Sequence, residues 1–352
     1  MPSPIRVLFH CTSKRGLGHL TRGLNLAREM RLLAPALDML FYTSGRSAAA
    51  LCGRDFPHVV QTETPGAPCF PEVVGAFCPH VIIYDTLLPE DVSDAPWPTS
   101  TRQVYIMRRC REDKQREIFA DPFMDHVDLI LIPHLPPEFG YEIPPRLGAR
   151  TCFAGPIVRT PAPEIQHRLR ETYGIGEQHF VLTSTAGGGG FEAHAESFFA
   201  TVFDVHRRLH PVMPHLLHLV VLGPNFGKSL TPLPGMRVVP FEPEMVNLLA
   251  ISDLAIAEGG YNTVNEIRLA KTPAVFLPSS RSFDDQEERV RALEQRGLAF
   301  VLPQRGDGAA RKIADLCASR FMLGELKRRY EADRMETGNR VAAERILELA
   351  GR

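Results

Sequence analysis

The strongest constraint on the fold is a regular alternation of short apolar strands with amphipathic helices, which runs along the whole chain. In the first half this pattern predicts strands at 6–10, 38–42, 81–85, 103–107 and 127–132. Strands that are separated by helices form parallel sheets covered by helices on both faces. We therefore expect a doubly wound α/β domain in this half.

The second half repeats the scheme, with strands expected at 180–185, 218–222, 237–240, 253–257, 274–277 and 299–302 and helices at 193–209, 263–270 and 284–296. Between the halves, Gly155-Pro156-Ile157 and the prolines that follow suit a linker. A chain of 352 residues is long enough for two cores. The sequence predicts two Rossmann-like domains, 1–156 and 157–336, followed by amphipathic helices that include a last one at about 337–352.

Composition narrows the class of protein. The 40 Lys and Arg residues nearly balance the 41 Asp and Glu residues, so no overall field favours nucleic acid. The seven cysteines are scattered without metal-ligand spacing, which is typical of reduced thiols. The chain shows neither a signal peptide nor an apolar run of about 18 residues. We expect a cytoplasmic protein without a transmembrane segment, and peripheral membrane contact stays open.

Two glycine-rich turns follow strands. Gly16 and Gly18 lie between the first strand and a helix that we expect to start near Leu20. Gly187, Gly188 and Gly189 follow the strand that ends at 185. Glycine lets a ligand approach the free N–H groups of a helix N-terminus, which bind anions. The turns predict phosphate contacts, although the second could also be merely flexible, and the first lacks the full dinucleotide fingerprint, which disfavours NAD.

The segment 223–229 superficially resembles a phosphate loop. It has three residues between its glycines where the nucleoside-triphosphatase motif has four, and no helix pattern follows it. We therefore exclude it.

The most informative segment leaves the strand that ends at 257. It contains Gly259, Gly260, Asn262, Thr263 and Glu266. The segment thus places two glycines, a polar cap and a carboxylate at the carboxyl edge of the sheet. This edge is where α/β proteins bind nucleotides. The alternative is structural, because Thr263 and Glu266 also have the spacing of a helix capping box.

These residues resemble a known family. The segment 259–266, the Lys-Thr-Pro-Ala at 271–274, and Asp285 and Gln286 are similar to the C-terminal domain of MurG-like glycosyltransferases, which are of glycosyltransferase family 28 type. The Gly-Leu-Gly-His-Leu at 16–20 resembles a bacterial group of predicted glycosyltransferases. The resemblance implies a GT-B fold, in which two Rossmann-like domains face a cleft. It also implies an acceptor site in the first domain, a donor nucleotide in the second, and a C-terminal helix that packs back on the first.

The resemblance also implies roles for individual residues. Glu266 would hold the donor ribose hydroxyls, and Phe241 and Glu242 would face the base. Asp285 and Gln286 would belong to the donor site, with Gln286 at the sugar. No metal and no cofactor other than the nucleotide-sugar substrate is implied. Glu287 stands where the family pattern has a second glutamine, so the donor sugar is expected to differ from N-acetylglucosamine.

Sugar transfer without a metal needs a base for the acceptor hydroxyl. His19 is our first candidate, because a helix N-terminus disfavours imidazolium and leaves a neutral base. Asp85, at the end of a strand, is the second. The structural alternatives are that His19 orients a loop or binds phosphate and that Asp85 caps a helix.

The segment 108–116 carries five basic residues, which could bind an anionic acceptor or form a solvated helix face.

The expected function is transfer of a sugar from a nucleotide-diphosphate donor, with a UDP-sugar favoured, to a small-molecule or lipid-linked acceptor, with inversion. The alternatives are a nucleotide-sugar hydrolase, an epimerase and a non-catalytic nucleotide-sugar binding or assembly protein. Gly-x-Gly-His-Leu-x-Arg at 16–22 is also similar to the hydrolase of pseudaminic acid synthesis.

Overall fold

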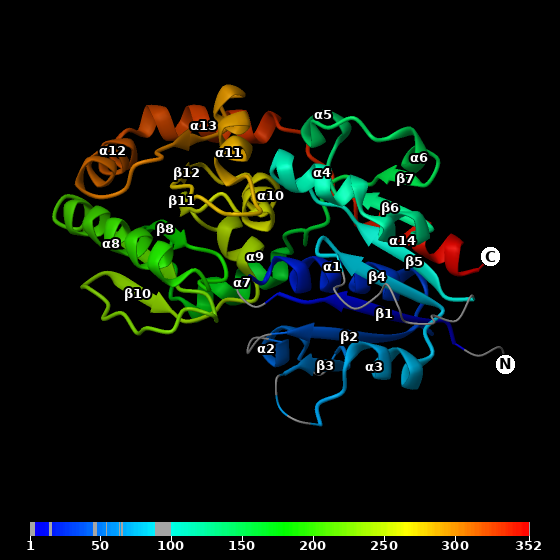
Figure 1. Ribbon diagram of the computed structural model, residues 1–352. Coiled ribbons are helices and arrows are strands. Elements are labelled where there is room, and N and C mark those ends of the chain that lie inside the picture. Colours follow the sequence, from blue (N-terminus) through cyan, green and yellow to red (C-terminus); the bar gives the residue numbers. More distant parts are fainter. Residues whose placement is uncertain are drawn as a thin grey trace. The chain divides into compact units, whose positions relative to one another are not determined.

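The computed structural model describes residues 4–13, 16–44, 48–53, 55–62, 64, 66–88 and 100–351. The chain divides into two compact units, which Figure 1 shows by sequence colour. Unit 1 comprises Met1–Val158 together with Glu336–Arg352, and unit 2 comprises Arg159–Met335.

Unit 1 is built on one parallel sheet in the order β3-β2-β1-β4-β5-β6-β7. Its strands are β1 Arg6–Cys11, β2 Asp38–Ser44, β3 His58–Gln61, β4 Val81–Asp85, β5 Arg102–Ile106, β6 Leu129–Ile132 and β7 Thr151–Phe153. From β1 the chain adds strands toward one edge of the sheet, and from β4 it adds them toward the other edge. The point between β1 and β4 is therefore the topological switch point of the sheet. In doubly wound sheets ligands bind at the carboxyl edge of such a switch point.

Helices cover both faces of this sheet. Helices α1 Gly18–Leu33 and α14 Asn339–Ala350 pack on one face, where the core includes Phe9 and Phe41. Helix α3 Phe70–Phe77 and the 3-10 helix η1 Pro122–His126 cover the other face. The shorter helices are α2 Ala48–Cys52, α4 Glu112–Ala120, α5 Pro136–Phe139 and α6 Pro145–Gly148. Alternate side chains of each strand thus meet different helices, as expected for a sheet buried on both faces.

Gly23 fixes the height of α1 above the sheet. A Cβ atom at this position would lie 2.7 Å from Cys11 Sγ and 3.2 Å from Phe41 Cε1. Because only glycine permits this approach, the second turn of α1 is held close to the end of β1. The helix also begins at Gly18 rather than near Leu20, so His19 lies within its first turn.

His10 is the buried histidine on the α3 face of β1. Its ring packs against Tyr42, Phe70 and Tyr84, and burial lowers its pKa from 6.5 to about 4. Between pH 6.5 and about 4, His10 is therefore protonated in the unfolded chain but neutral in the folded chain. The contribution of His10 to the free energy of unfolding is fully present above pH 6.5 and decreases as the pH falls toward 4.

We predict that His10→Phe flattens the acid dependence of stability. Between pH 7 and pH 5 the parent should lose about 2 kcal/mol more unfolding free energy than the variant. Urea denaturation at both pH values measures the difference, and His126→Phe on the exposed surface of η1 is the control. An equal loss in parent and His10→Phe would contradict the neutral, buried state of His10.

Unit 2 repeats the architecture with a parallel sheet in the order β10-β9-β8-β11-β12-β13. Its strands are β8 Phe180–Thr185, β9 Leu216–Val221, β10 Met236–Val239, β11 Leu254–Ala257, β12 Ala274–Phe276 and β13 Phe300–Val301. The switch point lies between β8 and β11. The prediction of two doubly wound α/β sheets is confirmed.

In unit 2, helices α8 Glu192–Leu209 and α12 Asp307–Ala318 pack on one face of the sheet. The other face is covered by α7 Pro163–Thr172, α9 Met245–Ala250, α10 Tyr261–Ala270, α11 Gln286–Gln295 and α13 Arg320–Ala332. Helix α13 begins at Arg320, because the Ser319 hydroxyl accepts a hydrogen bond from Met322 N and caps it. Among the helices that the structure describes, none has the length and hydropathy of a membrane span.

Candidate functional site

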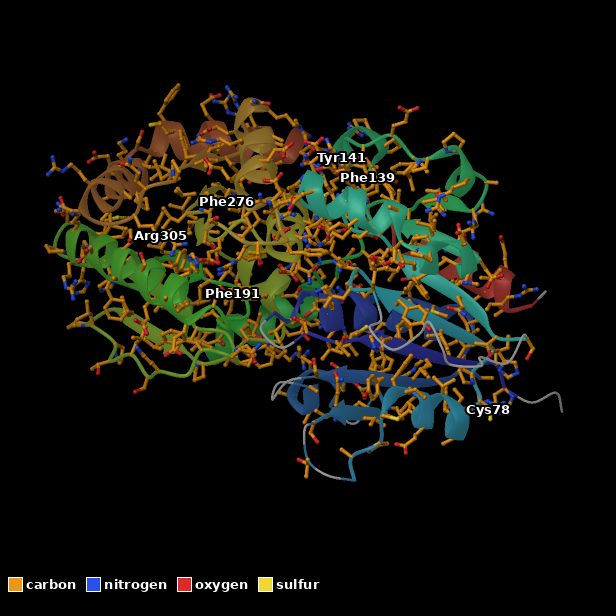
Figure 2. All side chains as sticks on the ribbon, in the orientation of Figure 1. Cys78, Phe139, Tyr141, Phe191, Phe276 and Arg305 are labelled. Carbon is orange, nitrogen blue, oxygen red and sulfur yellow. The ribbon has the colours of Figure 1, made fainter. Side chains whose placement is uncertain are left out.

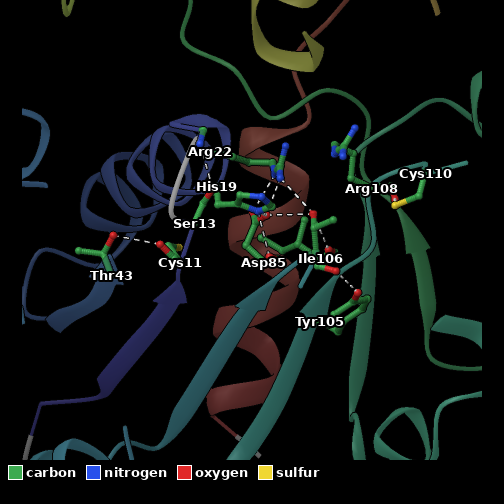
Figure 3. Close-up of polar contacts among 12 residues, drawn as sticks. Cys11, Ser13, His19, Arg22, Thr43, Asp85, Tyr105, Ile106, Arg108 and Cys110 are labelled. Atoms are coloured by element: carbon green, nitrogen blue, oxygen red, sulfur yellow. Dashed lines mark hydrogen bonds and ion pairs between the residues drawn. The ribbon is translucent and has the colours of Figure 1, made fainter. Parts of the chain in front are cut away.

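The switch point of unit 1 holds a histidine, a carboxylate and an arginine in direct contact (Figure 3). His19 and Arg22 project from α1 toward Asp85, the last residue of β4. His19 Nδ1 lies 2.8 Å from Asp85 Oδ1, and Arg22 donates from Nε to Oδ2 at 2.7 Å and from Nη2 to Oδ1 at 2.5 Å. The structure therefore brings together both residues that the sequence proposed as candidate bases.

Asp85 is ionised in this setting. Burial alone would raise its pKa, but Arg22 and the hydrogen bond from His19 together hold it well below its usual value. An ionised carboxylate only accepts hydrogen bonds, so the His19 Nδ1 atom must carry the proton. Among the described residues, none hydrogen-bonds the opposite ring nitrogen, and 16% of the side chain is exposed. In the neutral tautomer that this contact favours, the lone pair is on Nε2.

The backbone after Asp85 is strained and tightly held. Thr86 has a φ of +61°, which is unusual for a β-branched residue. Its hydroxyl donates to Asp85 Oδ1 at 3.0 Å, Arg22 Nη2 lies 3.1 Å from the same hydroxyl, and the Tyr105 hydroxyl donates to Thr86 O. These contacts fix Asp85 toward α1 and differ from the backbone contacts of a helix cap.

In unit 2, the glycine turn after β8 is a fixed structure. Gly187 and Gly189 have φ angles of +69° and +74°, and a Cβ on Gly189 would lie 2.7 Å from Leu222 O. Gly188 O accepts a hydrogen bond from Asn225 N at 3.0 Å. The turn therefore packs against the loop that follows β9, which argues against simple flexibility. That loop, at 223–229, leads into no helix in the structure.

The segment after β11 differs from one expectation. Helix α10 begins at Tyr261 with Gly260 as its N-cap, so Thr263 lies inside the helix and cannot cap it. The capping-box interpretation of Thr263 and Glu266 is therefore wrong. A Cβ on Gly259 would lie 2.8 Å from Val290 Cγ1, so this glycine is required for packing against α11. Asn262 and Thr263 occupy the first turn of α10.

Glu266 is a buried carboxyl group that lies in the second turn of α10. Burial raises its pKa to about 7, although Arg159 opposes the shift. In the described part of the chain its carboxylate has no hydrogen-bond partner. A buried acid with a raised pKa and no structural duty is typical of a functional site.

The other predicted donor residues have partners within unit 2. Glu242 is buried and accepts from Tyr173 Oη at 2.6 Å and from Glu244 N at 2.7 Å, while Phe241 is partly exposed beside it. Asp285 accepts from Glu288 N and caps α11. Gln286 Oε1 accepts from Ser279 N and Ser279 Oγ at 3.3 Å each. Glu242 and Asp285 thus shape the loops of this edge.

Three charged residues at the switch point of unit 2 were missed by sequence reasoning. Glu258, directly after β11, accepts from Arg281 Nη2 at 2.6 Å and from Arg305 Nη2 at 2.7 Å. No local sequence pattern predicts this cluster, because Arg281 and Arg305 lie 23 and 47 residues from Glu258 along the chain.

The basic segment 108–116 does not form one patch. Arg108 is buried just beyond the end of β5. On α4 and at its start, three of the cations form ion pairs with neighbouring acids: Arg111 with Asp113, Lys114 with Glu117, and Arg116 with Glu112. The structure favours a solvated face for this helix.

Comparison with known proteins matches unit 2 to a family. Residues 222–315 match the model of the glycosyltransferase family 28 C-terminal domain. This segment of unit 2 is thus similar to a family 28 C-terminal domain. This match begins directly after β9 and covers the Glu258 cluster, α10 with Glu266, and α11.

Two curated relatives are also similar to this chain. An uncharacterized glycosyltransferase of Methanopyrus kandleri is 24% identical over 178 residues, which are 50% of this chain and 48% of the relative. The UDP-N-acetylglucosamine–N-acetylmuramyl-(pentapeptide) pyrophosphoryl-undecaprenol N-acetylglucosamine transferase of Ralstonia nicotianae is 38% identical over 116 residues, 32% of this chain and 30% of the relative. The chain thus spans half or less of the length of these relatives.

Solved structures extend the likeness to the whole chain. The kitacinnamycin glycotransferase has a TM-score of 0.62 at 18% identity and covers 99% of this chain and 100% of its own. A spinosyn rhamnosyltransferase complexed with thymidine diphosphate has a TM-score of 0.61 at 17% identity and covers 98% of this chain and 100% of its own. The chain has the GT-B fold. The predicted resemblance to MurG-like glycosyltransferases is confirmed.

Proposed function

We propose that the protein is a glycosyltransferase that moves a sugar from a nucleotide-diphosphate donor to a hydroxyl acceptor. The observation that carries the proposal is the His19–Asp85 pair at the switch point of unit 1, in a chain whose second unit contains a segment similar to a family 28 C-terminal domain. A UDP-sugar is the favoured donor, since the Ralstonia relative is named for UDP-N-acetylglucosamine. Glu287 favours another sugar.

In this proposal unit 2 binds the donor. Glu266 accepts hydrogen bonds from the ribose hydroxyls, which would give its buried carboxyl group the partners that the described residues do not supply. The backbone N–H groups around Gly187 and Gly260 face the diphosphate, as helix N-termini do. Phe241 packs near the base, and Gln286 contacts the sugar.

Unit 1 supplies the base. His19 Nε2 takes the proton of the acceptor hydroxyl while the oxygen attacks the anomeric carbon and the bond to the diphosphate breaks, with inversion at that carbon. Asp85 orients the ring through Nδ1 and stabilises the imidazolium that forms. The leaving diphosphate is stabilised by N–H groups and arginines, so we propose that the reaction needs no metal. The acceptor is a small molecule or a lipid-linked one.

Donor binding is expected to depend on Glu266 and on pH. The ribose hydroxyls can donate two hydrogen bonds only to the ionised carboxylate, and its pKa is about 7. The ratio of the parent's UDP affinity to that of Glu266→Gln should therefore rise about tenfold between pH 6 and pH 8.

Isothermal titration calorimetry with UDP measures both proteins. Protonation of the UDP phosphates changes the affinity of the parent and of Glu266→Gln equally, so the ratio of the two affinities reports the ionisation of Glu266 alone. Glu287→Gln serves as the control. A pH-independent ratio, or UDP binding that Glu266→Gln leaves intact, would remove Glu266 from the donor site.

A further inference from the structure

The Glu258 cluster is a buried ion group with more positive than negative charge. The side chains of Glu258, Arg281 and Arg305 are 4%, 8% and 12% exposed. Two guanidinium groups share one carboxylate. Asp284, the other acid that faces Arg281, already forms a bidentate ion pair with Arg289, at 2.6 Å and 3.3 Å. One buried positive charge therefore lacks a dedicated counter-ion, which is costly at such low exposure.

Arg281 and Arg305 differ in their hydrogen-bond partners. Arg305 pairs with Glu258 and also donates to Leu277 O at 3.1 Å and to His194 O, so it is anchored on three sides. Arg281 pairs with Glu258 through Nη2, but its Nη1 atom is buried and has no acceptor among the described residues. Buried N–H donors are nearly always hydrogen-bonded in native proteins, so an orphan at a site edge needs an explanation.

Arg281 also touches the glycine turn. Its guanidinium carbon lies 3.8 Å from the centre of the Phe191 ring, and Phe191 joins the turn at 187–190 to α8. Figure 2 labels Phe191 and Arg305 in the same unit. Stacking on an aromatic ring holds the guanidinium plane in place. The orphan donor is therefore fixed at the edge of the sheet that carries the glycine turn and the start of α10.

We propose that Arg281 binds the terminal phosphate of the donor diphosphate through Nη1, with Glu258 as the fixed counter-ion that positions Arg281 and Arg305. The phosphate adds the second negative charge that the two arginines lack and accepts the hydrogen bond of the orphan N–H. The proposal rests on the proposed function only for the identity of the ligand. The site itself is defined by its charge and its unpartnered donor.

The first test compares UMP with UDP by isothermal titration calorimetry. The parent should bind UDP at least tenfold more tightly than UMP. In Arg281→Gln this gain should vanish while UMP affinity changes less than twofold, since Glu258 keeps its ion pair with Arg305. Arg291→Gln, which removes an exposed cation from α11, should keep the full gain. A gain that survives in Arg281→Gln would overturn the proposal.

The second test uses inorganic pyrophosphate and removes the counter-ion instead. Glu258→Gln leaves two buried cations unpaired, so its melting temperature should fall. Pyrophosphate should then raise the melting temperature more in Glu258→Gln than in the parent, because it replaces the lost negative charge. An equal shift in both proteins, or none, would show that the cluster is only structural. If pyrophosphate acts as expected but neither UMP nor UDP binds, the phosphate site stands and the proposed function fails.

Discussion

His19→Ala is expected to lower kcat by about 10²- to 10⁴-fold, the usual contribution of a positioned general base. The structure explains why His19 is suited to this role. The ionised Asp85 carboxylate accepts a hydrogen bond from Nδ1–H, so in the neutral ring the lone pair on Nε2 is available to an acceptor hydroxyl. Because His19 belongs to unit 1 and the proposed donor site to unit 2, the affinity for UDP should stay within twofold of the parent.

Steady-state kinetics and UDP titration measure the two quantities separately. His126→Ala, which removes an exposed histidine of unit 1, controls for the loss of any imidazole. Asp85→Asn adds a second check, because a neutral amide lets the ring adopt the other tautomer and should lower kcat while UDP binding persists. A His19→Ala enzyme that retains more than a third of the parent's kcat would exclude His19 as the base.

Asp85→Ala is expected to reduce the unfolding free energy by about 3–5 kcal/mol, the cost of breaking a buried ion pair from one side. Arg22 is 1% exposed, and the change removes the carboxylate that its Nε and Nη2 atoms contact. The hydroxyl of the strained Thr86 also loses its hydrogen bond to Asp85 Oδ1. Chemical denaturation of the parent and the variant measures the loss.

A double variant separates this effect from a general loss of packing. Replacing the pair with apolar residues, as in Arg22→Met with Asp85→Leu, removes both charges and should restore most of the lost stability. The double variant should still have a low kcat, because no carboxylate stabilises the imidazolium of His19. If Arg22→Met with Asp85→Leu is less stable than Asp85→Ala, the buried charge is not the source of the loss.

The sequence identified His19 and Asp85 because each lies where a strand ends and a loop or helix begins. It could not show that they touch. Their contact follows from the pairing of β1 with β4, which brings together residues 66 positions apart. Arg22 was given no role although a signal existed: it lies three residues after His19, which places both side chains on the same side of α1.

In the proposed donor site of unit 2, local sequence patterns identified some residues but not the arginines. Glycine turns and Glu266 were found from local patterns, but the arginines on Glu258 come from the loops after β12 and β13. Their convergence depends on strand order, which local patterns do not contain. The short edge strands β3 and β7 were missed for a similar reason, since strands of four and three residues carry little periodicity.

The prediction that α10 starts at Thr263 failed because Gly260 serves as its N-cap. Glycine is an accepted N-cap residue but gives a weaker signal than the threonine that follows.

The central claim is that the protein transfers a sugar to an acceptor, and one measurement addresses it directly. The purified protein is incubated with a panel of UDP-sugars, with and without a mixture of hydroxyl acceptors that includes a bacterial lipid extract, and the reaction is followed by NMR. Our account predicts UDP release only when an acceptor is present, and a product with inverted anomeric configuration. Free sugar that accumulates equally without acceptor would instead identify a hydrolase, and a donor that binds but is never cleaved would contradict an enzymatic role.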